Sequence, residues 1–325
     1  MPTHKQGAKV KILLHYPFDE DQVKTFQDVA AKYNSEALFT TDDDEAVSLA
    51  SDVEVMIGFF KPPVCAAAPN LKWIQSFSAG MDHFLFPEII ERDVEISNAA
   101  GLHAPQGGEH AWAMLLALAR GIRPGLERMQ EKQWGGVNVV EVSGGTLGLI
   151  GLGGFGMEML KRAQGYNMTV LALDAVKTEK PEGVTELKQP TTEHFHALLE
   201  RCDAVMTACP LTKETYHLFG AEAFKHMKSS AFLINVTRGG IVDEDALVDA
   251  LKGEEIAGAA LDVCETEPLP EDSPLWTAPN LLLTPHRAGA SQHRQRRLFE
   301  FFVQNLERYL KSEPVQNVVD KERGF

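Results

Sequence analysis

One glycine-rich stretch decides the fold: Gly151-Leu152-Gly153-Gly154-Phe155-Gly156. Its pattern, Gly-x-Gly-x-x-Gly, is weak evidence when it stands alone. Here it follows an apolar run, Leu147 to Ile150, and opens a segment of helical spacing that starts at Met157. The next apolar run ends in Asp174, 23 residues after Gly151. A strand, a glycine turn, a helix and a second strand ending in an acid predict a dinucleotide-binding βαβ unit.

Each glycine of this motif has its own expected role. Gly151 permits the tight turn, and Gly156 allows the helix to pack closely on the strand. Gly153 lets the backbone approach a pyrophosphate at the positive N-terminus of the helix. Asp174 can accept hydrogen bonds from a ribose 2′-hydroxyl, and its charge repels a 2′-phosphate. The motif therefore predicts NAD rather than NADP. A purely structural glycine turn ranks below this interpretation, because strand, helix and acid are all in place.

The motif belongs to a longer alternation of strand and helix signals. The predicted strands are 10–14, 53–59, 71–77, 146–150, 168–174, 203–208, 231–236 and 256–263. The predicted helices are 19–33, 107–120, 244–251 and 291–310. Of these, 107–120 is apolar nearly all round, which predicts burial on several sides, with Gly121 as its stop. The alternation predicts an α/β fold with parallel sheets covered by helices.

The composition excludes several classes of function. The chain of 325 residues corresponds to about two domains. With 31 Lys and Arg against 46 Asp and Glu, its net charge of −15 argues against nucleic-acid and anionic-membrane partners. The longest apolar run, 111–119, is too short to span a bilayer, and the first residues lack a signal peptide's apolar core. Four cysteines without a Cys-x-x-Cys pair predict reduced thiols and a cytoplasmic protein. No cluster has metal-ligand spacing, so no metal is expected.

Three polar segments follow predicted strands in the second half of the chain. They are Asn235-Val236-Thr237-Arg238-Gly239-Gly240, then Leu261 to Pro268, then Leu283-Thr284-Pro285-His286-Arg287-Ala288-Gly289. All three lie at or just beyond the carboxyl ends of strands. Open α/β sheets bind their ligands at that edge. The segments are therefore candidates for an active site.

With these segments the sequence resembles the D-isomer-specific 2-hydroxyacid dehydrogenase family, which includes glyoxylate/hydroxypyruvate reductases and D-lactate-type enzymes. The resemblance covers nearly the whole chain. It starts at Leu71-Lys72-Trp73-Ile74 and Ser78-Ala79-Gly80-Met81-Asp82, takes in the glycine motif and Cys209-Pro210-Leu211-Thr212, and reaches Gln316-Asn317-Val318-Val319. It implies two doubly wound domains with an active-site cleft between them. A flavodoxin-like substrate domain is expected from residues 1–103 and 290–325, and a Rossmann nucleotide domain from 104–289.

The resemblance implies a catalytic set of Arg238, Glu267 and His286. Reduction of a 2-oxo acid places a hydride on C2 and a proton on the carbonyl oxygen. A protonated His286 can donate that proton, and a neutral His286 removes it in the reverse direction. Glu267 would favour the imidazolium and fix its tautomer, and Arg238 would hold the substrate carboxylate and polarise the carbonyl. Glu265 competes with Glu267 for the acid role, but Glu267 precedes a proline, as in the family's Glu-Pro pattern.

The resemblance also implies the residues that contact each ligand. Asp262 would hold the nicotinamide carboxamide, and the substrate carboxylate would meet the backbone N–H groups of a small-residue loop. The expected cofactor contacts are Gly151, Gly153, Phe155, Gly156, Asp174, Cys209, Pro210, Thr215, Thr237, Arg238, Asp262, His286 and Gly289. The expected substrate contacts are Ser78, Ala79, Gly80, Arg238 and His286.

Partners and alternatives complete these expectations. The apolar segment 107–120, with Trp134 beyond it, predicts a homodimer, as in the family. The alternative function is a dinucleotide-sensing corepressor of the same fold. A formate dehydrogenase would carry Gln in place of Glu267, and a phosphite dehydrogenase would carry Lys where this chain has Ala79. Three positions depart from the family pattern: Gly154 replaces a common Arg, Arg287 replaces an apolar residue, and Gly107-Gly108 are unusually flexible for the start of a helix.

Overall fold

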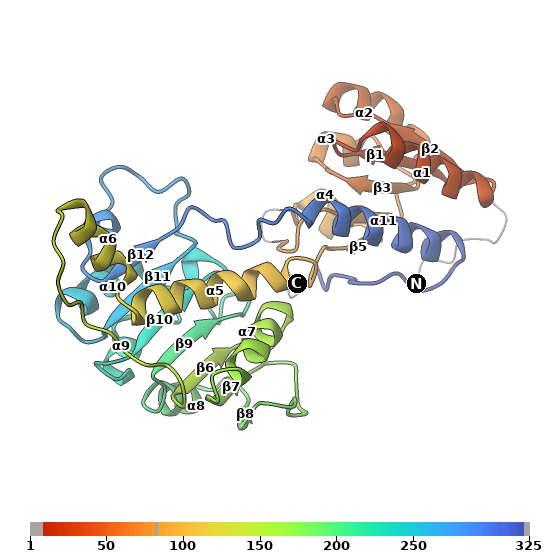
Figure 1. Cartoon of the computed structure of the whole chain (residues 1–325). Helices are drawn as coiled ribbons and strands as arrows, with labels where there is room; N and C mark the ends of the chain where they lie inside the picture. The colour runs from red at the N-terminus through yellow and green to blue at the C-terminus, as the bar shows by residue number, and fades with distance from the viewer. Residues whose placement is uncertain (1–8, 82–83, 322–325) are drawn as a thin grey trace. The chain divides into compact units, whose positions relative to one another are not determined.

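The computed structural model describes residues 9–81 and 84–321. They form two compact units, each described here by itself (Figure 1). Unit 1 comprises the described residues up to Leu102 and those from Ser291 onward, and unit 2 runs from His103 to Ala290. The boundaries predicted at 103/104 and 289/290 each lie one residue away from these.

Unit 1 is built on a five-stranded parallel sheet with the order β2-β1-β3-β4-β5. Its strands are β1 (Lys11–His15), β2 (Glu36–Phe39), β3 (Val55–Gly58), β4 (Trp73–Ser76) and β5 (Glu95–Ser97). Its helices are α1 (Glu20–Lys32), α2 (Asp43–Leu49), α3 (Pro62–Ala66), α4 (Pro87–Ile90) and α11 (Arg294–Leu310), with a 3-10 turn at Ala50–Asp52. The first helix starts with a capping box, because Asp19 accepts from the Gln22 amide at 2.8 Å and Gln22 accepts in return.

Helix α11 brings the C-terminal part of the chain back onto unit 1. It begins at Arg294, three residues later than predicted, and lies beside α1 (Figure 1). Its buried Phe302 and Leu306 join the same core cluster as Phe26. The buried amide of Asn305 donates to Gln75 Oε1 at 2.7 Å and so ties the helix to β4. The N-terminal and C-terminal segments therefore share one core.

Unit 2 contains a seven-stranded parallel sheet with the order β12-β11-β10-β9-β6-β7-β8. The chain starts at β6 and winds outward first to one edge and then to the other, which is the doubly wound arrangement that the glycine motif predicts. The strands are β6 (Thr146–Ile150), β7 (Thr169–Leu173), β8 (Glu186–Lys188), β9 (Ala204–Thr207), β10 (Phe232–Asn235), β11 (Gly258–Leu261) and β12 (Leu281–Leu283). The helices are α5 (Ala104–Ala119), α6 (Ile122–Gln130), α7 (Gly154–Gln164), α8 (Thr192–Leu199), α9 (Ala221–His226) and α10 (Glu244–Lys252), with 3-10 turns at Gly239–Ile241 and Pro274–Thr277.

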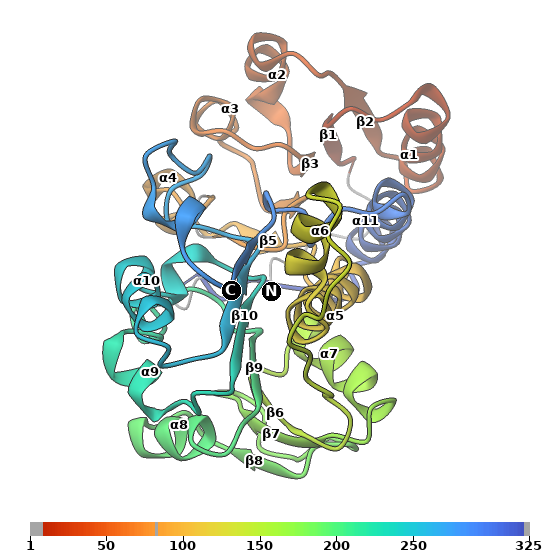
Figure 2. The same ribbon diagram turned by 60° about the vertical axis from the view of Figure 1, so that its left-hand side comes forward.

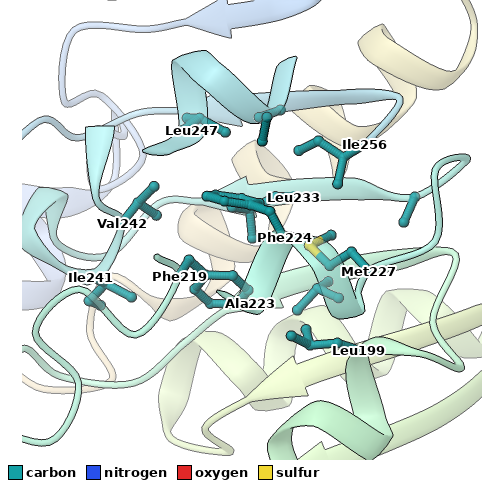
Figure 3. Packing of buried hydrophobic residues seen from close by; sticks show 14 of the residues in the cluster. Leu199, Phe219, Ala223, Phe224, Met227, Leu233, Ile241, Val242, Leu247 and Ile256 are labelled. Atoms are coloured by element: carbon teal, nitrogen blue, oxygen red, sulfur yellow. The ribbon is translucent and has the colours of Figure 1, made fainter. Parts of the chain in front are cut away.

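Helices cover both faces of this sheet. Figure 2 shows α8, α9 and α10 on one face and α5 and α7 on the other. The first face carries a core cluster that includes Phe219, Phe224 and Leu233 (Figure 3). On the second face, Trp112 of α5 stacks on Tyr166 with ring centroids 4.7 Å apart and donates to the Met159 carbonyl at 3.0 Å. The sheet is therefore buried on both sides, as its apolar strands require.

Helix α5 corrects part of the argument for a dimer. It begins at Ala104, three residues before the predicted start, and Gly121 follows it in the left-handed conformation with φ 62°. Its two glycines make a close approach possible, since a Cβ on Gly107 would lie 2.5 Å from the Phe155 ring of α7. Its main apolar side chains are buried within unit 2. Exposed apolar side chains lie instead on α6, which has no buried residue, and at the fully exposed Trp134.

Candidate active site

The glycines of the Gly151–Gly156 loop differ in the space around their Cβ positions. Gly151 has φ +100°, and a Cβ there would lie 2.7 Å from the Ala208 carbonyl oxygen. A Cβ on Gly156 would lie 2.2 Å from the Gly151 carbonyl oxygen. Gly153, which precedes the first residue of α7, has nothing within 4 Å of its Cβ position. The fold itself requires Gly151 and Gly156, whereas space is left open at Gly153.

Asp174 is fixed beside this loop at the end of β7. Its Oδ2 accepts from the Leu152 amide at 2.7 Å, inside the glycine loop. Its Oδ1 accepts from the amides of Val176 at 2.8 Å and Lys177 at 2.7 Å. The carboxylate is partly buried and therefore holds the loop as well as presenting a negative charge next to it.

The segment after β9 packs against the same loop. A Cβ on Gly151 would lie 2.8 Å from the backbone nitrogen of Cys209. Burial raises the pKa of the Cys209 thiol to about 12, so this thiol stays protonated at neutral pH. Thr215 donates to the Pro210 carbonyl at 2.7 Å and accepts from the Thr212 amide at 2.7 Å. These contacts give the segment a defined shape next to the glycine loop.

Arg238 lies just beyond β10 in a tightly packed turn. The buried Asn235 shapes this turn, because its amide donates to the Arg238 carbonyl at 2.8 Å and its Oδ1 accepts from the Thr237 amide at 3.1 Å. The guanidinium Nη1 of Arg238 donates to the Thr237 carbonyl at 2.7 Å. The next residue, Gly239, lies against the chain after β11, since a Cβ there would lie 1.9 Å from the Cys264 carbonyl carbon. The Arg238 turn and the Cys264–Glu267 segment are thus direct neighbours.

Glu267 and His286 form a close hydrogen-bonded pair. The distance between His286 Nδ1 and Glu267 Oε2 is 2.6 Å, and Glu267 Oε1 accepts from the Cys264 amide at 3.0 Å. A carboxylate only accepts, so Nδ1 carries the proton and Nε2 is the nitrogen left for a substrate. The side chains of His286 and Glu267 are 51% and 37% exposed. A histidine with one ring nitrogen bound to an acid and the other left open can transfer a proton.

Glu265, the competing acid, belongs to a different pair. Its Oε1 lies 2.9 Å from His217 Nε2, and its amide donates to Glu244 Oε1 at 2.7 Å. His217 is therefore an acid-paired histidine. Burial raises the pKa of Glu244, and the nearby charges of Glu265 and Glu267 raise it further, although its bond from the Glu265 amide lowers it.

Asp262 lies at the end of β11 and is only 1% exposed. Its Oδ1 accepts from the Arg287 amide at 2.8 Å and from the Thr284 hydroxyl at 2.5 Å, and its Oδ2 accepts from the Ala288 amide at 2.7 Å. His110 of α5 places its Nε2 3.3 Å from Oδ1. Burial alone would raise the pKa of Asp262, but these hydrogen bonds outweigh it, and the pKa is lowered. Gly289, at the end of this loop, accepts from the Gln106 amide at 3.2 Å.

The expected substrate loop belongs to unit 1. Ser78 donates to the Gly80 carbonyl at 2.8 Å and its amide donates to Ser76 Oγ at 3.1 Å, while Asn98 donates to the Ala79 carbonyl at 3.0 Å. Asp82 lies outside the described residues. Arg238, Glu267, His286 and the glycine loop all belong to unit 2. A shared cleft between the units therefore remains a prediction.

The nucleotide half of the chain matches a known family. Residues 112–288 fit the family model described as D-isomer specific 2-hydroxyacid dehydrogenase, NAD binding domain. The chain belongs to this family. A glyoxylate reductase of Korarchaeum cryptofilum (strain OPF8) is 33% identical over 289 residues, which are 85% of each chain. The chain is accordingly a 2-hydroxyacid oxidoreductase with an NAD-binding Rossmann unit.

Two solved structures resemble this chain over nearly its whole length. A D-isomer specific 2-hydroxyacid dehydrogenase from Xanthobacter autotrophicus Py2, in complex with NADPH and MES, is 28% identical with a TM-score of 0.83 and covers 98% of this chain and 100% of its own. An NAD-dependent formate dehydrogenase from Staphylococcus aureus, in complex with NAD, is 27% identical with a TM-score of 0.72 and covers 96% of this chain and 99% of its own. The structures named here thus include both cofactors.

The described residues contain neither a metal-binding cluster nor a membrane-spanning helix. Within residues 9–81 and 84–321, no three His, Cys, Asp or Glu side chains are grouped so that they could hold a metal ion. Over the same part of this 2-hydroxyacid dehydrogenase, no helix is long and apolar enough to cross a membrane.

Proposed function

We propose that this protein is an NAD-dependent D-2-hydroxyacid dehydrogenase, which interconverts a small-molecule 2-oxo acid and the D-2-hydroxy acid. The observation that carries the proposal is the 2.6 Å pair between His286 and Glu267, in the same unit as Arg238 and the glycine loop. We also propose a cytoplasmic location, which is in keeping with the four free cysteines.

The residues around the glycine loop fit a dinucleotide. The open space at Gly153, in front of the 11-residue helix α7, suits a pyrophosphate at a positive helix end. Asp174 supplies an acceptor for a ribose hydroxyl, and Phe155, Cys209, Pro210, Thr215, Thr237 and Gly289 are proposed to line the rest of the site. When bound, NADH supplies the hydride that reduces C2 of the substrate.

Three side chains of unit 2 are proposed to act on the substrate. His286 Nε2 gives its proton to the carbonyl oxygen during reduction and takes it back from the hydroxyl during oxidation. Glu267 keeps the proton on Nδ1 and stabilises the positive ring. Arg238 binds the substrate carboxylate and polarises the carbonyl. The Ser78-Ala79-Gly80 loop is proposed to receive the same carboxylate through its backbone amides.

An NADH-oxidation screen tests the reaction. The substrates are glyoxylate, hydroxypyruvate, pyruvate, phenylpyruvate and branched 2-oxo acids. We expect turnover on at least one, and His286→Ala lowers kcat by about 100–10,000-fold because the proton donor is gone. The matched control is His194→Ala, because His194 belongs to α8 and its Nδ1 lies 2.9 Å from the Gln189 carbonyl oxygen. Dinucleotide binding without turnover on any of these acids would favour the corepressor alternative.

The preference for NAD rests on Asp174 and has its own test. We expect a higher kcat/KM with NADH than with NADPH. Asp174→Asn is the sharper variant, because it removes the charge while an oxygen remains to accept from a loop amide, whereas Asp174→Ala also loosens the loop. The asparagine variant should narrow the gap between the two cofactors. Equal or better activity of the wild type with NADPH would refute the assignment of Asp174.

We also propose a homodimer that forms through α6 and the segment after it. Ile122 and Leu126 are each 51% exposed, Met129 is 64% exposed, and Trp134 is fully exposed. Apolar side chains gathered on one short helix are typical of a protein–protein contact. This surface replaces α5 as the basis of the expectation.

A further inference from the structure

The backbone at His286 is held in an uncommon conformation. Its φ is +51°, in the left-handed region that residues other than glycine seldom adopt. Two backbone contacts stabilise this turn: the His286 amide donates to the Asp262 carbonyl at 2.7 Å and to the Thr284 carbonyl at 3.1 Å. Such a conformation persists only when its surroundings fix it.

The side chain of Asp262 fixes the next two residues. Its two oxygens accept from the amides of Arg287 and Ala288 at 2.8 and 2.7 Å. One buried carboxylate thus spans the loop directly after His286. The direction in which the imidazole leaves the backbone therefore depends on where this carboxylate is held.

Two further side chains hold the carboxylate, and their protons can be placed. Thr284 has a single hydroxyl proton, which it donates to Asp262 Oδ1 at 2.5 Å because a carboxylate can only accept. The Thr284 oxygen is then the acceptor in its 2.9 Å contact with His110 Nε2. His110 consequently carries its proton on Nε2, from where it also faces Asp262 Oδ1 at 3.3 Å. The chain of hydrogen bonds runs from α5 through Thr284 and Asp262 to the histidine loop.

We propose that His110 and Thr284 are positioning residues for His286, which act through the carboxylate of Asp262. The inference rests on the proposed role of His286 as the acid/base. Neither residue belongs to the catalytic set or to the expected ligand contacts. Because both oxygens of Asp262 accept from residues 284–288, this carboxylate orients the histidine loop, whether or not it also accepts from a cofactor.

Paired substitutions at Thr284 and His110 test this proposal. Thr284→Val keeps the side-chain shape and removes the hydroxyl, whereas Thr284→Ser restores it. His110→Leu removes the donor, whereas His110→Gln places an amide nitrogen near the position of Nε2. We expect the valine and leucine variants to lower kcat by about 10–100-fold, as misplacement of a catalytic group does. Their Kd for NADH stays within about twofold, and the serine and glutamine variants recover most of the rate.

Amide hydrogen exchange gives a second readout that does not need turnover. The peptide spanning residues 283–290 contains the amides of Arg287 and Ala288, and their exchange should accelerate at least about fivefold in Thr284→Val. The matched control is Thr185→Val, which loses a side-chain bond from the Val170 amide at 3.2 Å in the same unit. That control should leave both kcat and the exchange of 283–290 unchanged.

The outcomes separate this proposal from the proposed function. A folded Thr284→Val protein with normal kcat and normal exchange at 283–290 overturns the proposal. An equal loss of NADH affinity and kcat also overturns it, because the network would then act on the cofactor. If the wild type turns over no 2-oxo acid, the proposed function fails. Faster exchange in the valine variant would still support the anchoring of the loop by Thr284, and unchanged exchange would still refute it.

Discussion

Gly153 and Gly156 offer a test that separates the needs of the fold from those of a ligand. In Gly156→Ala the new Cβ lies 2.2 Å from a carbonyl oxygen, so the backbone itself must move. Overpacking of this kind costs about 1–3 kcal/mol, and alanine returns up to about 1 kcal/mol through helix propensity. In Gly153→Ala nothing lies within 4 Å of the new Cβ. The residue caps α7, where alanine is poorer than glycine by less than about 1 kcal/mol.

The two variants should therefore differ in kind. We expect Gly156→Ala to lower the free energy of unfolding by about 1–2 kcal/mol, and Gly153→Ala to lower it by less than about 1 kcal/mol. Gly153→Ala should nevertheless weaken NADH binding at least about tenfold, because its methyl group occupies the approach of the pyrophosphate. Urea unfolding and NADH fluorescence titration measure the two quantities.

Gly125→Ala is the control, since its Cβ position in α6 is also open and lies outside the motif. It should leave NADH affinity unchanged and leave stability equal or slightly higher. If Gly153→Ala binds NADH within about twofold of the wild type, the pyrophosphate does not approach at Gly153. The role assigned to Gly153 in the glycine motif would then be wrong.

Three other perturbations have equally specific outcomes. Glu267→Gln should move the basic limb of the kcat/KM profile for reduction about 0.1–0.7 of a pH unit lower, because a half-exposed pair contributes about 0.2–1 kcal/mol and one pH unit corresponds to about 1.4 kcal/mol. An unmoved limb between pH 5 and 9 removes Glu267 from the mechanism. Met129→Asp should convert a dimer to a monomer in light scattering at micromolar concentration, and a monomeric wild type would contradict the dimer. Asp203 accepts from the Thr146 amide and from Lys228 Nζ, both at 2.8 Å, and although burial would raise its pKa these bonds lower it. A depressed carboxyl pKa stabilises the fold above the unfolded value of about 4, and this effect is lost as pH falls through the folded value. Asp203→Asn should therefore lower the free energy of unfolding by about 1 kcal/mol from pH 7 to 5 and by progressively less below pH 4. An unchanged loss of stability at pH 3 would show that the charge is not involved.

The sequence predicts the central strands of each sheet but not the edge strands. The eight predicted strands all correspond to observed ones, such as β6 and β9 in the middle of unit 2. None of β2, β5, β8 and β12 has a predicted range of its own, and these four are the edge strands of the two sheets. Each has only three or four residues, and β8 (Glu-Leu-Lys) and β5 (Glu-Ile-Ser) are mostly polar. An apolar run or a period of two needs more residues than that to stand out.

In the candidate site too, some residues can be predicted from the sequence and others cannot. Arg238, Glu267 and His286 can be found because each follows an apolar strand in a segment with a recognisable pattern. The contact between His110 and Thr284 joins residues 174 positions apart, and a histidine inside an apolar helix carries no signal of its partner. The same holds for His217 and Glu265. Only the folded sheet brings α5 next to the loop after β12, so such partners come from topology and not from local pattern.

The division of unit 1 between the two ends of the chain has a consequence for synthesis on the ribosome. Sheet residues such as Ile12 and Leu14 share their core with Phe302 and Leu306 of α11, which are translated only after all of unit 2. At 5–20 residues per second the intervening residues 103–290 take roughly 10–40 s. During that interval the nascent first half exposes an aromatic face that a chaperone can recognise. Ribosome-bound chains stalled after residue 290 should therefore be cleaved by protease within residues 9–81, and chains extended far enough for α11 to leave the exit tunnel should resist.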